Sequence, residues 1–166
     1  IRTSVPAKTN RSHLNSLIAG FEKPRQQHAS DFHAVLRNLA ENLPRRGFVI
    51  IFSDLFGDRN ALCKGLQLLR QRGHDVAICH ILDDDEIDFP FDGPTRFEGL
   101  ETGGEISCSP RALRNGYIQA MENFLAEVRN RSAASQCDYQ LARTSHAVDK
   151  TLVNFLSRRS RIRGRS

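Results

Sequence analysis

The sequence predicts an α/β domain: a Rossmann-like, mostly parallel sheet flanked by helices. The apolar run 48–52 follows Gly47 and stops at Ser53 and Asp54, which is typical of a strand buried on both faces. A second apolar run follows at 76–82, and helical patterns precede and separate the two runs. This order predicts parallel strands joined by a right-handed crossover, with the first run in the middle of the sheet.

The N-terminal third predicts two amphipathic helices. Residues 1–10 indicate the end of a strand followed by a loop. Ser12 can cap a short helix that closes at Gly20, and a polar loop follows at 25–29. Ser30 can cap a second helix, whose apolar stripe continues to Leu43 before a turn leads into the first apolar run.

Asp58 can cap the helix between the two apolar runs, which spans 59–72 and directs Leu62, Leu66 and Leu69 inward. Residues 83–109 predict a loop and a small β-hairpin outside the main sheet.

The C-terminal third predicts a long helix, an edge strand and a last helix. Pro110 opens the longest helix, which runs to about Ser132. A more polar strand follows at 137–142. The last helix, at about 147–156, is predicted to bury the apolar residues Leu152, Val153, Phe155 and Leu156.

Composition indicates one globular domain of 166 residues with a formal net charge of +5. Five of the 24 basic residues are arginines in the last nine positions, so the rest of the chain has 24 − 5 = 19 basic and 19 acidic residues. We therefore expect a domain over 1–157 and a disordered basic tail over 158–166. A nucleic-acid partner is not expected, although a contact through the tail is the alternative.

The four cysteines are far apart and form no C-x-x-C pair, which argues against a zinc module and against a disulfide scaffold. Reduced cysteines favour the cytoplasm. No apolar run has the length of a membrane span, so we expect no membrane segment.

Asp54 is the first candidate for chemistry because ligands of such sheets gather beyond the carboxyl ends of the strands. The residue can bind a divalent cation, accept a phosphoryl group or cap the following turn. Ser30 and Asp31 begin the helix that leads into the same strand and can approach Asp54. Their hydroxyl and carboxylate oxygens suit Mg²⁺, while Ser30 as a simple helix cap is the other interpretation.

The remaining candidates favour structural roles. Residues 83–88 are rich in acids but lack the spacing of a calcium loop, which predicts a solvated acidic loop. His80 is the one histidine within a strongly apolar strand, and we interpret it as a hydrogen-bonded core residue. Ser53 lacks the glycines of a nucleophile elbow. Because no catalytic constellation is complete, we expect no enzyme; a metal-dependent hydrolase or phosphoryl-transfer domain that uses Asp54 is the alternative.

Three blocks of the sequence resemble the DUF58 family: RRGFVIIFSDLF at 45–56, LLRQRGHDV at 68–76 and FDGPTRFEGLETG at 91–103. Members of this family are bacterial proteins with a von Willebrand factor A-like domain, often encoded beside MoxR-type AAA+ ATPases. The resemblance implies a Rossmann-like domain without an established catalytic activity. It also implies a role in protein interaction or assembly, with a MoxR-type ATPase as a candidate partner.

Such domains often hold a cation in a metal-ion-dependent adhesion site, whose three loops supply D-x-S-x-S, a Thr and an Asp. By this resemblance Ser30 stands where the second-loop Thr is expected, with Asp31 beside it, and Asp54 matches the third-loop Asp. The D-x-S-x-S motif is absent from the sequence, so we expect the chain to begin after that strand. The expectation is therefore no metal held by this chain alone and Mg²⁺ or Mn²⁺ in the intact protein.

The same resemblance predicts that the first central strand, which would neighbour the run 48–52, is missing. The apolar edge of that run would then be exposed. We expect marginal stability or self-association through this edge.

Overall fold

A computed structural model describes residues 5, 12–22, 32–44, 46–98 and 104–163. In chain order the elements are α1 (Ser12–Glu22), α2 (Phe32–Asn42), β1 (Phe48–Ser53), α3 (Arg59–Gln71), β2 (Asp75–Leu82), α4 (Asp84–Asp88), β3 (Thr95–Glu98), β4 (Glu105–Cys108), α5 (Pro110–Ala134), β5 (Asp138–Arg143) and α6 (Val148–Arg163). The predicted strand and loop at 1–10, apart from Val5, and the predicted loop at 25–29 lie outside the described residues.

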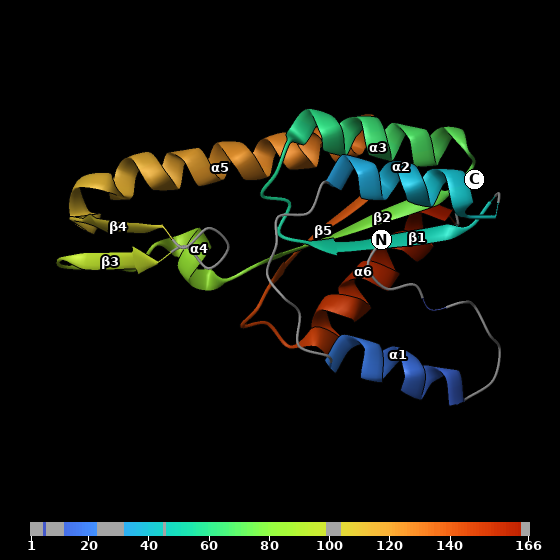
Figure 1. The fold of residues 1–166 in the computed structure, drawn as a ribbon, viewed down its shortest axis with the longest axis horizontal. Coiled ribbons are helices and arrows are strands. Elements are labelled where there is room, and N and C mark those ends of the chain that lie inside the picture. Colours follow the sequence, from blue (N-terminus) through green and yellow to red (C-terminus); the bar gives the residue numbers. More distant parts are fainter. Residues whose placement is uncertain (1–4, 6–11, 23–31, 45, 99–103, 164–166) are drawn as a thin grey trace.

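The main sheet has three parallel strands in the order β1-β2-β5. The hairpin β3-β4 is separate and antiparallel, and it lies beyond the main sheet at the amino-terminal end of α5 (Figure 1). These findings confirm a mixed α/β architecture with a parallel sheet flanked by helices, which is compatible with a Rossmann-like fold.

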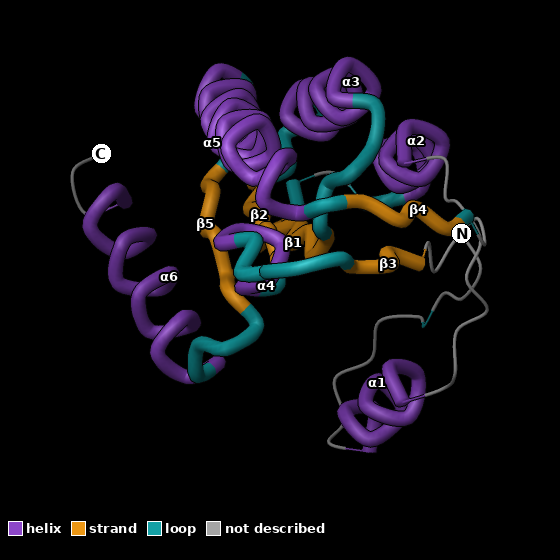
Figure 2. Tube along the Cα trace, turned by 90° about the vertical axis from the view of Figure 1, so that its left-hand side faces the viewer, coloured by secondary structure: helices purple, strands orange, loops and turns teal. Residues whose placement is uncertain are grey.

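Helices α2, α3 and α5 form a layer on one face of the sheet, while α6 and α1 lie on the other side (Figures 1 and 2). The core lies between this helical layer and the sheet, and its members include Leu36, Ile51, Leu66 and Val128. Helices α2 and α3 approach closely at Gly65, where an added Cβ would lie 2.4 Å from Cδ1 of Leu36. The core therefore tolerates no side chain at that position without a shift.

Strand β1 is not buried on both faces, and this part of the prediction is wrong. Phe48, Ile50 and Phe52 are exposed, because alternate side chains of a strand point to opposite faces and the helical layer covers one of them. Among the described strands β1 pairs with β2 alone, so it lies at an edge of the sheet and not in its middle. None of the described strands pairs with the outer edge of β1, and the exposure of that edge through a missing first strand stays a prediction.

Helix α6 corrects two predictions about the C-terminus. The helix runs to Arg163, beyond its predicted end at about residue 156, while 164–166 lie outside the described part. Leu152, Val153 and Leu156 are exposed, although the periodicity predicted them to be buried. The helix is held to the sheet by the charged group of Arg159 and turns these apolar side chains outward.

The acidic segment forms a helix where a loop was predicted. Asp83 caps α4: its side chain accepts a hydrogen bond from the backbone of Asp85, and Glu86 completes a capping box. Within the part of the chain that the structure describes, no helix combines the length and apolar composition of a membrane span.

Candidate functional site

The loop after β1 is tightly wound at the carboxyl edge of the sheet. The Leu55 backbone N–H donates to Oγ of Ser53 at 3.1 Å, and the Phe56 N–H donates to Oδ1 of Asp54 at 3.2 Å. The Gly57 N–H donates to the Leu55 carbonyl at 2.9 Å. Asp54 thus has the turn-capping role that was one of its three interpretations.

Leu55 adopts a left-handed backbone conformation, with φ of 58°, while its side chain is buried at 6% exposure. For a residue with a Cβ this conformation costs about 1 kcal/mol or more. Burial of the Leu55 side chain in the core offsets that cost and fixes the loop.

His80 lies directly beneath the loop and is fully buried. Its Nε2 is 2.7 Å from the Asp54 carbonyl oxygen, and its Nδ1 is 2.8 Å from the Tyr139 hydroxyl. Burial lowers the pKa of His80, against a smaller opposing effect of Asp54, and burial raises the pKa of Tyr139 to about 12. The interpretation of His80 as a hydrogen-bonded core residue is confirmed.

The carboxylate of Asp54 points to the surface, since the residue is exposed. Its Oδ1 accepts from Phe56 and lies 3.5 Å from the Ser53 hydroxyl. Its Oδ2 has no hydrogen-bond partner among the described residues. This oxygen is available to a ligand from outside the domain.

An apolar groove of about 370 Å³ lies next to the loop. The Phe56 ring is 52% exposed and stacks on Phe124 with ring centroids 5.2 Å apart. The other lining residues come from the loop, the start of α3 and the middle of α5: Gly57, Arg59, Tyr117, Ala120 and Met121. A charged group and an apolar surface therefore adjoin at this edge.

The predicted metal ligands are brought together only in part. Asp54 stands at the edge as expected, but Ser30 and Asp31 lie outside the described residues. No group of three or more His, Cys, Asp or Glu side chains suited to a metal ion occurs within the described ranges. The carboxylate of Asp54 and the hydroxyl of Ser53 supply the oxygen donors that Mg²⁺ prefers, and that ion needs few protein ligands. These two side chains are therefore of the chemical type that binds such a cation.

Two acids of α4, Asp84 and Asp88, lie at the same edge and are paired with Arg143. Nη1 of Arg143 contacts both Asp84 and Asp88 at 2.8 Å, and Thr144 donates to Asp83. The hydrogen bond from Arg143 is the main cause that lowers the pKa of Asp88. These contacts give the acidic segment a structural role.

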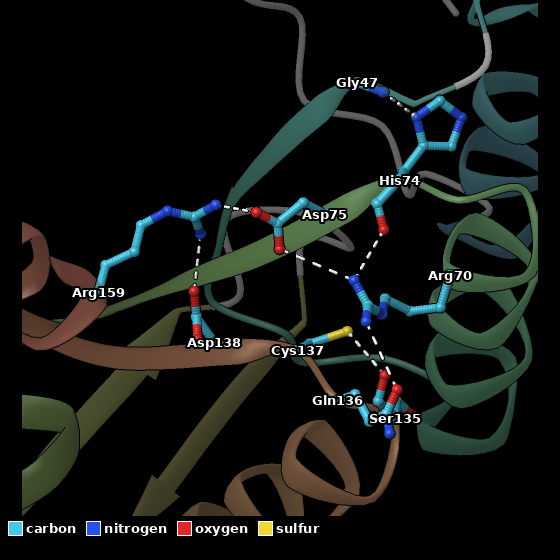
Figure 3. A network of polar contacts seen from close by, with 9 residues as sticks. All are labelled: Gly47, Arg70, His74, Asp75, Ser135, Gln136, Cys137, Asp138 and Arg159. Carbon is cyan, nitrogen blue, oxygen red and sulfur yellow. Dashed lines mark hydrogen bonds and ion pairs between the residues drawn. The ribbon is translucent and has the colours of Figure 1, made fainter. Parts of the chain in front are cut away.

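The opposite, amino edge of the sheet carries the network drawn in Figure 3. The Arg159 guanidinium binds Asp75 and also Asp138, the latter at 2.7 Å, and it lies over the Phe48 ring at 3.9 Å from the centroid. Arg70 reaches Asp75 at 3.7 Å from the other side. The network ties α6 and α3 to the starts of all three parallel strands.

Comparison with known proteins gives one match. The model of the family described as "Protein of unknown function DUF58" matches residues 1–126. No curated protein and no solved structure matches the chain. With the match covering most of the sequence, the chain belongs to the DUF58 family.

Proposed function

We propose that this domain is a non-catalytic protein-interaction or assembly module with a von Willebrand factor A-like arrangement, and that it binds through the loop 53–57 at the carboxyl edge of its sheet. The observation that carries the proposal is the Asp54 carboxylate, which is exposed although its backbone is fixed. A fixed loop loses little conformational entropy when a partner binds.

The contacts of His80 favour binding over catalysis. Asp54 would need a nearby acid–base group for hydrolysis or phosphoryl transfer, and His80 is a titratable residue that contacts its backbone. Both ring nitrogens of His80 are engaged, by Tyr139 and by the Asp54 carbonyl. The imidazole is therefore unsuited to take a proton from a substrate at the surface. The alternative is a metal-dependent hydrolase or phosphoryl-transfer domain that uses Asp54.

A divalent cation would complete the interaction in the intact protein. Asp54, with Ser30 and Asp31 by family resemblance, would hold Mg²⁺ or Mn²⁺. Bound there, the cation supplies positive charge that attracts a carboxylate of the partner. The exposed Phe56 ring and the adjoining groove would add apolar contact area to that polar contact.

The partner we propose is a MoxR-type AAA+ ATPase, as the family resemblance suggests. A cytoplasmic location fits the four cysteines, which are all unpaired.

Self-association is a second candidate interaction, and the exposed edge of β1 favours it. The outer edge of β1 pairs with no described strand and carries neither Pro nor Lys, and Phe48, Ile50 and Phe52 lie exposed on the adjoining open face, with the Arg159 guanidinium over the Phe48 ring. We expect Phe52→Lys to shift any concentration-dependent dimer to monomer in sedimentation velocity. An unchanged sedimentation profile would exclude this edge.

The function is tested with the intact protein on a biosensor that carries a MoxR-type ATPase from the same genome. We expect binding with Mg²⁺, weaker binding in EDTA, and loss of binding for Asp54→Asn. Asp92→Asn is the matched control, since Asp92 is an exposed carboxylate on the loop before the hairpin. A hydrolase or phosphoryl-transfer turnover that disappears with Asp54→Asn would overturn the proposal in favour of the enzyme.

A further inference from the structure

The parallel register places His80 between the two neighbouring strands, opposite Ser53 on β1 and Leu141 on β5. Its ring makes an edge contact with Phe124 of α5, at 5.5 Å between centroids. The same Phe124 stacks on Phe56 of the loop. His80 is thus enclosed by the elements that build the proposed site.

The hydrogen bonds of His80 define its protonation. The Asp54 carbonyl can only accept, so Nε2 of His80 carries the proton and donates. In a neutral ring Nδ1 then accepts, and the Tyr139 hydroxyl donates to it. Tyr139, His80 and the Asp54 carbonyl therefore form one directed chain of hydrogen bonds that starts on β5 and ends under the loop.

This chain restrains the peptide plane between Asp54 and Leu55. His80 donates a hydrogen bond to the carbonyl of that plane. Leu55, which follows it, has positive φ and a buried side chain. The plane is consequently held from both sides. The Asp54 carboxylate branches from the Cα next to this plane, so the same restraint sets the direction in which it leaves the loop.

We infer that His80, oriented by the Tyr139 hydroxyl, is a positioning residue of the Asp54 site, acting through the Asp54 carbonyl without touching the ligand. The inference rests on the proposed function, because it assigns to His80 the orientation of the carboxylate that binds. Outer residues of this kind typically change metal affinity about 10-fold to 100-fold when they are replaced.

The test measures Mn²⁺ affinity by electron paramagnetic resonance in the intact protein and in three variants, together with their free energies of unfolding. His80→Gln keeps a side-chain N–H that can reach the Asp54 carbonyl, whereas His80→Leu removes it. We expect affinity within about threefold of the parent for His80→Gln and about tenfold weaker binding for His80→Leu. Asp54→Asn serves as the variant that lacks the carboxylate proposed to bind Mn²⁺.

The outcomes separate the inference from the proposed function. Equal Mn²⁺ affinity of the parent and a folded His80→Leu variant would overturn the positioning role and leave the binding site in place. Absence of Mn²⁺ binding in the parent would overturn the metal-assisted site and the inference with it. If Mn²⁺ affinity and the free energy of unfolding decrease together in both His80 variants, His80 has a purely structural role. That result would overturn the inference.

A second measurement holds even where His80→Leu fails to fold. Nitrogen-15 NMR of histidine-labelled protein reports which ring nitrogen is protonated, with the His80 signal assigned by its loss in His80→Gln. We expect the Nε2–H form in the parent, and in Tyr139→Phe a mixture of forms with weaker Mn²⁺ binding. The Nδ1–H form in the parent would contradict the directed chain and overturn the inference.

Discussion

The two edges of the sheet use charged side chains in opposite ways. At the amino edge the Arg159 side chain is only 12% exposed and contacts both Asp75 and Asp138. At the carboxyl edge the Asp54 carboxylate is exposed, and within the described ranges one of its oxygens has no hydrogen-bond partner. Its backbone is nevertheless held by buried groups, His80 and the Leu55 side chain.

This difference separates a structural from a binding role. At the amino edge, charged side chains are paired with one another. They hold elements of the fold together and are not available to a ligand. A carboxylate that contributes little to the fold, on a loop held rigid from below, is suited to a partner. Asp84 and Asp88 of α4 sharpen the contrast, because they lie at the carboxyl edge and are nevertheless paired with Arg143.

The largest effect is expected at the amino edge. Replacing Arg159 with Met leaves Asp138 without its cation and Asp75 with the longer contact to Arg70. Because the pair is partly exposed, we expect a loss of about 2 kcal/mol in the free energy of unfolding, below the range for fully buried pairs. Urea denaturation measures it. Arg37→Met, which breaks the exposed pair with Glu41, is the control and should cost about 0.5 kcal/mol or less.

The helical layer covers the sheet between both edges. A substitution in it should therefore change the free energy of unfolding without affecting one edge more than the other. Gly65→Ala places a Cβ 2.4 Å from the Leu36 side chain, and we expect a net loss of about 1 to 2 kcal/mol despite the better helix propensity of Ala. Gly116→Ala in α5 meets nothing within 4 Å and should gain about 0.5 to 1 kcal/mol. Equal changes for the two variants in thermal unfolding would refute the close approach of α2 and α3.

At the carboxyl edge the effect on stability should be small. Asp54→Asn retains an oxygen that can accept from the Phe56 N–H, so we expect a change of about 0.5 kcal/mol or less in the free energy of unfolding. Urea denaturation beside Arg159→Met gives the comparison directly. A loss as large as that of Arg159→Met would make Asp54 a structural residue and remove the contrast between the edges.

The smallest effect concerns the pH dependence of the paired acids. Arg143 lowers the pKa of Asp88, so this interaction stabilises the fold above the ordinary carboxyl pKa of about 4 and is lost as pH falls through the lowered value. We expect Arg143→Gln to raise the pKa of Asp88 toward its ordinary value. A carboxyl carbon-13 NMR titration measures the change. An unaltered Asp88 pKa would mean that Arg143 is not its partner in solution.

Local sequence patterns predicted most of the elements but not their environment. The apolar runs around Ile51 and Ile78, the Asp58 cap and Pro110 at the start of α5 all lie where expected, because each depends on neighbouring residues alone. Exposure of Phe52 depends on which face the helices cover, which no local pattern contains. The same limit applies to Leu152 and Leu156, whose helix is oriented by a distant ion pair of Arg159.

The sequence predicted the central residue of the candidate site, but it did not predict all of the contacts that hold this residue in place. Asp54 was identified because strand ends of parallel sheets gather ligands, and His80 because it interrupts an apolar strand. Tyr139 was missed, since its contact with His80 spans 59 positions and depends on the parallel pairing of β2 with β5. The positive φ of Leu55 was also invisible, because leucine is not a residue that signals this conformation.

The most direct test of the account is a calorimetric Mn²⁺ titration of the intact protein beside Asp54→Asn and Asp88→Asn. The account predicts one site in the parent, its loss in Asp54→Asn and its retention in Asp88→Asn, because Asp88 is already bound by Arg143. Retention of the site in Asp54→Asn, or its loss in Asp88→Asn, would contradict the assignment of binding to the free carboxylate.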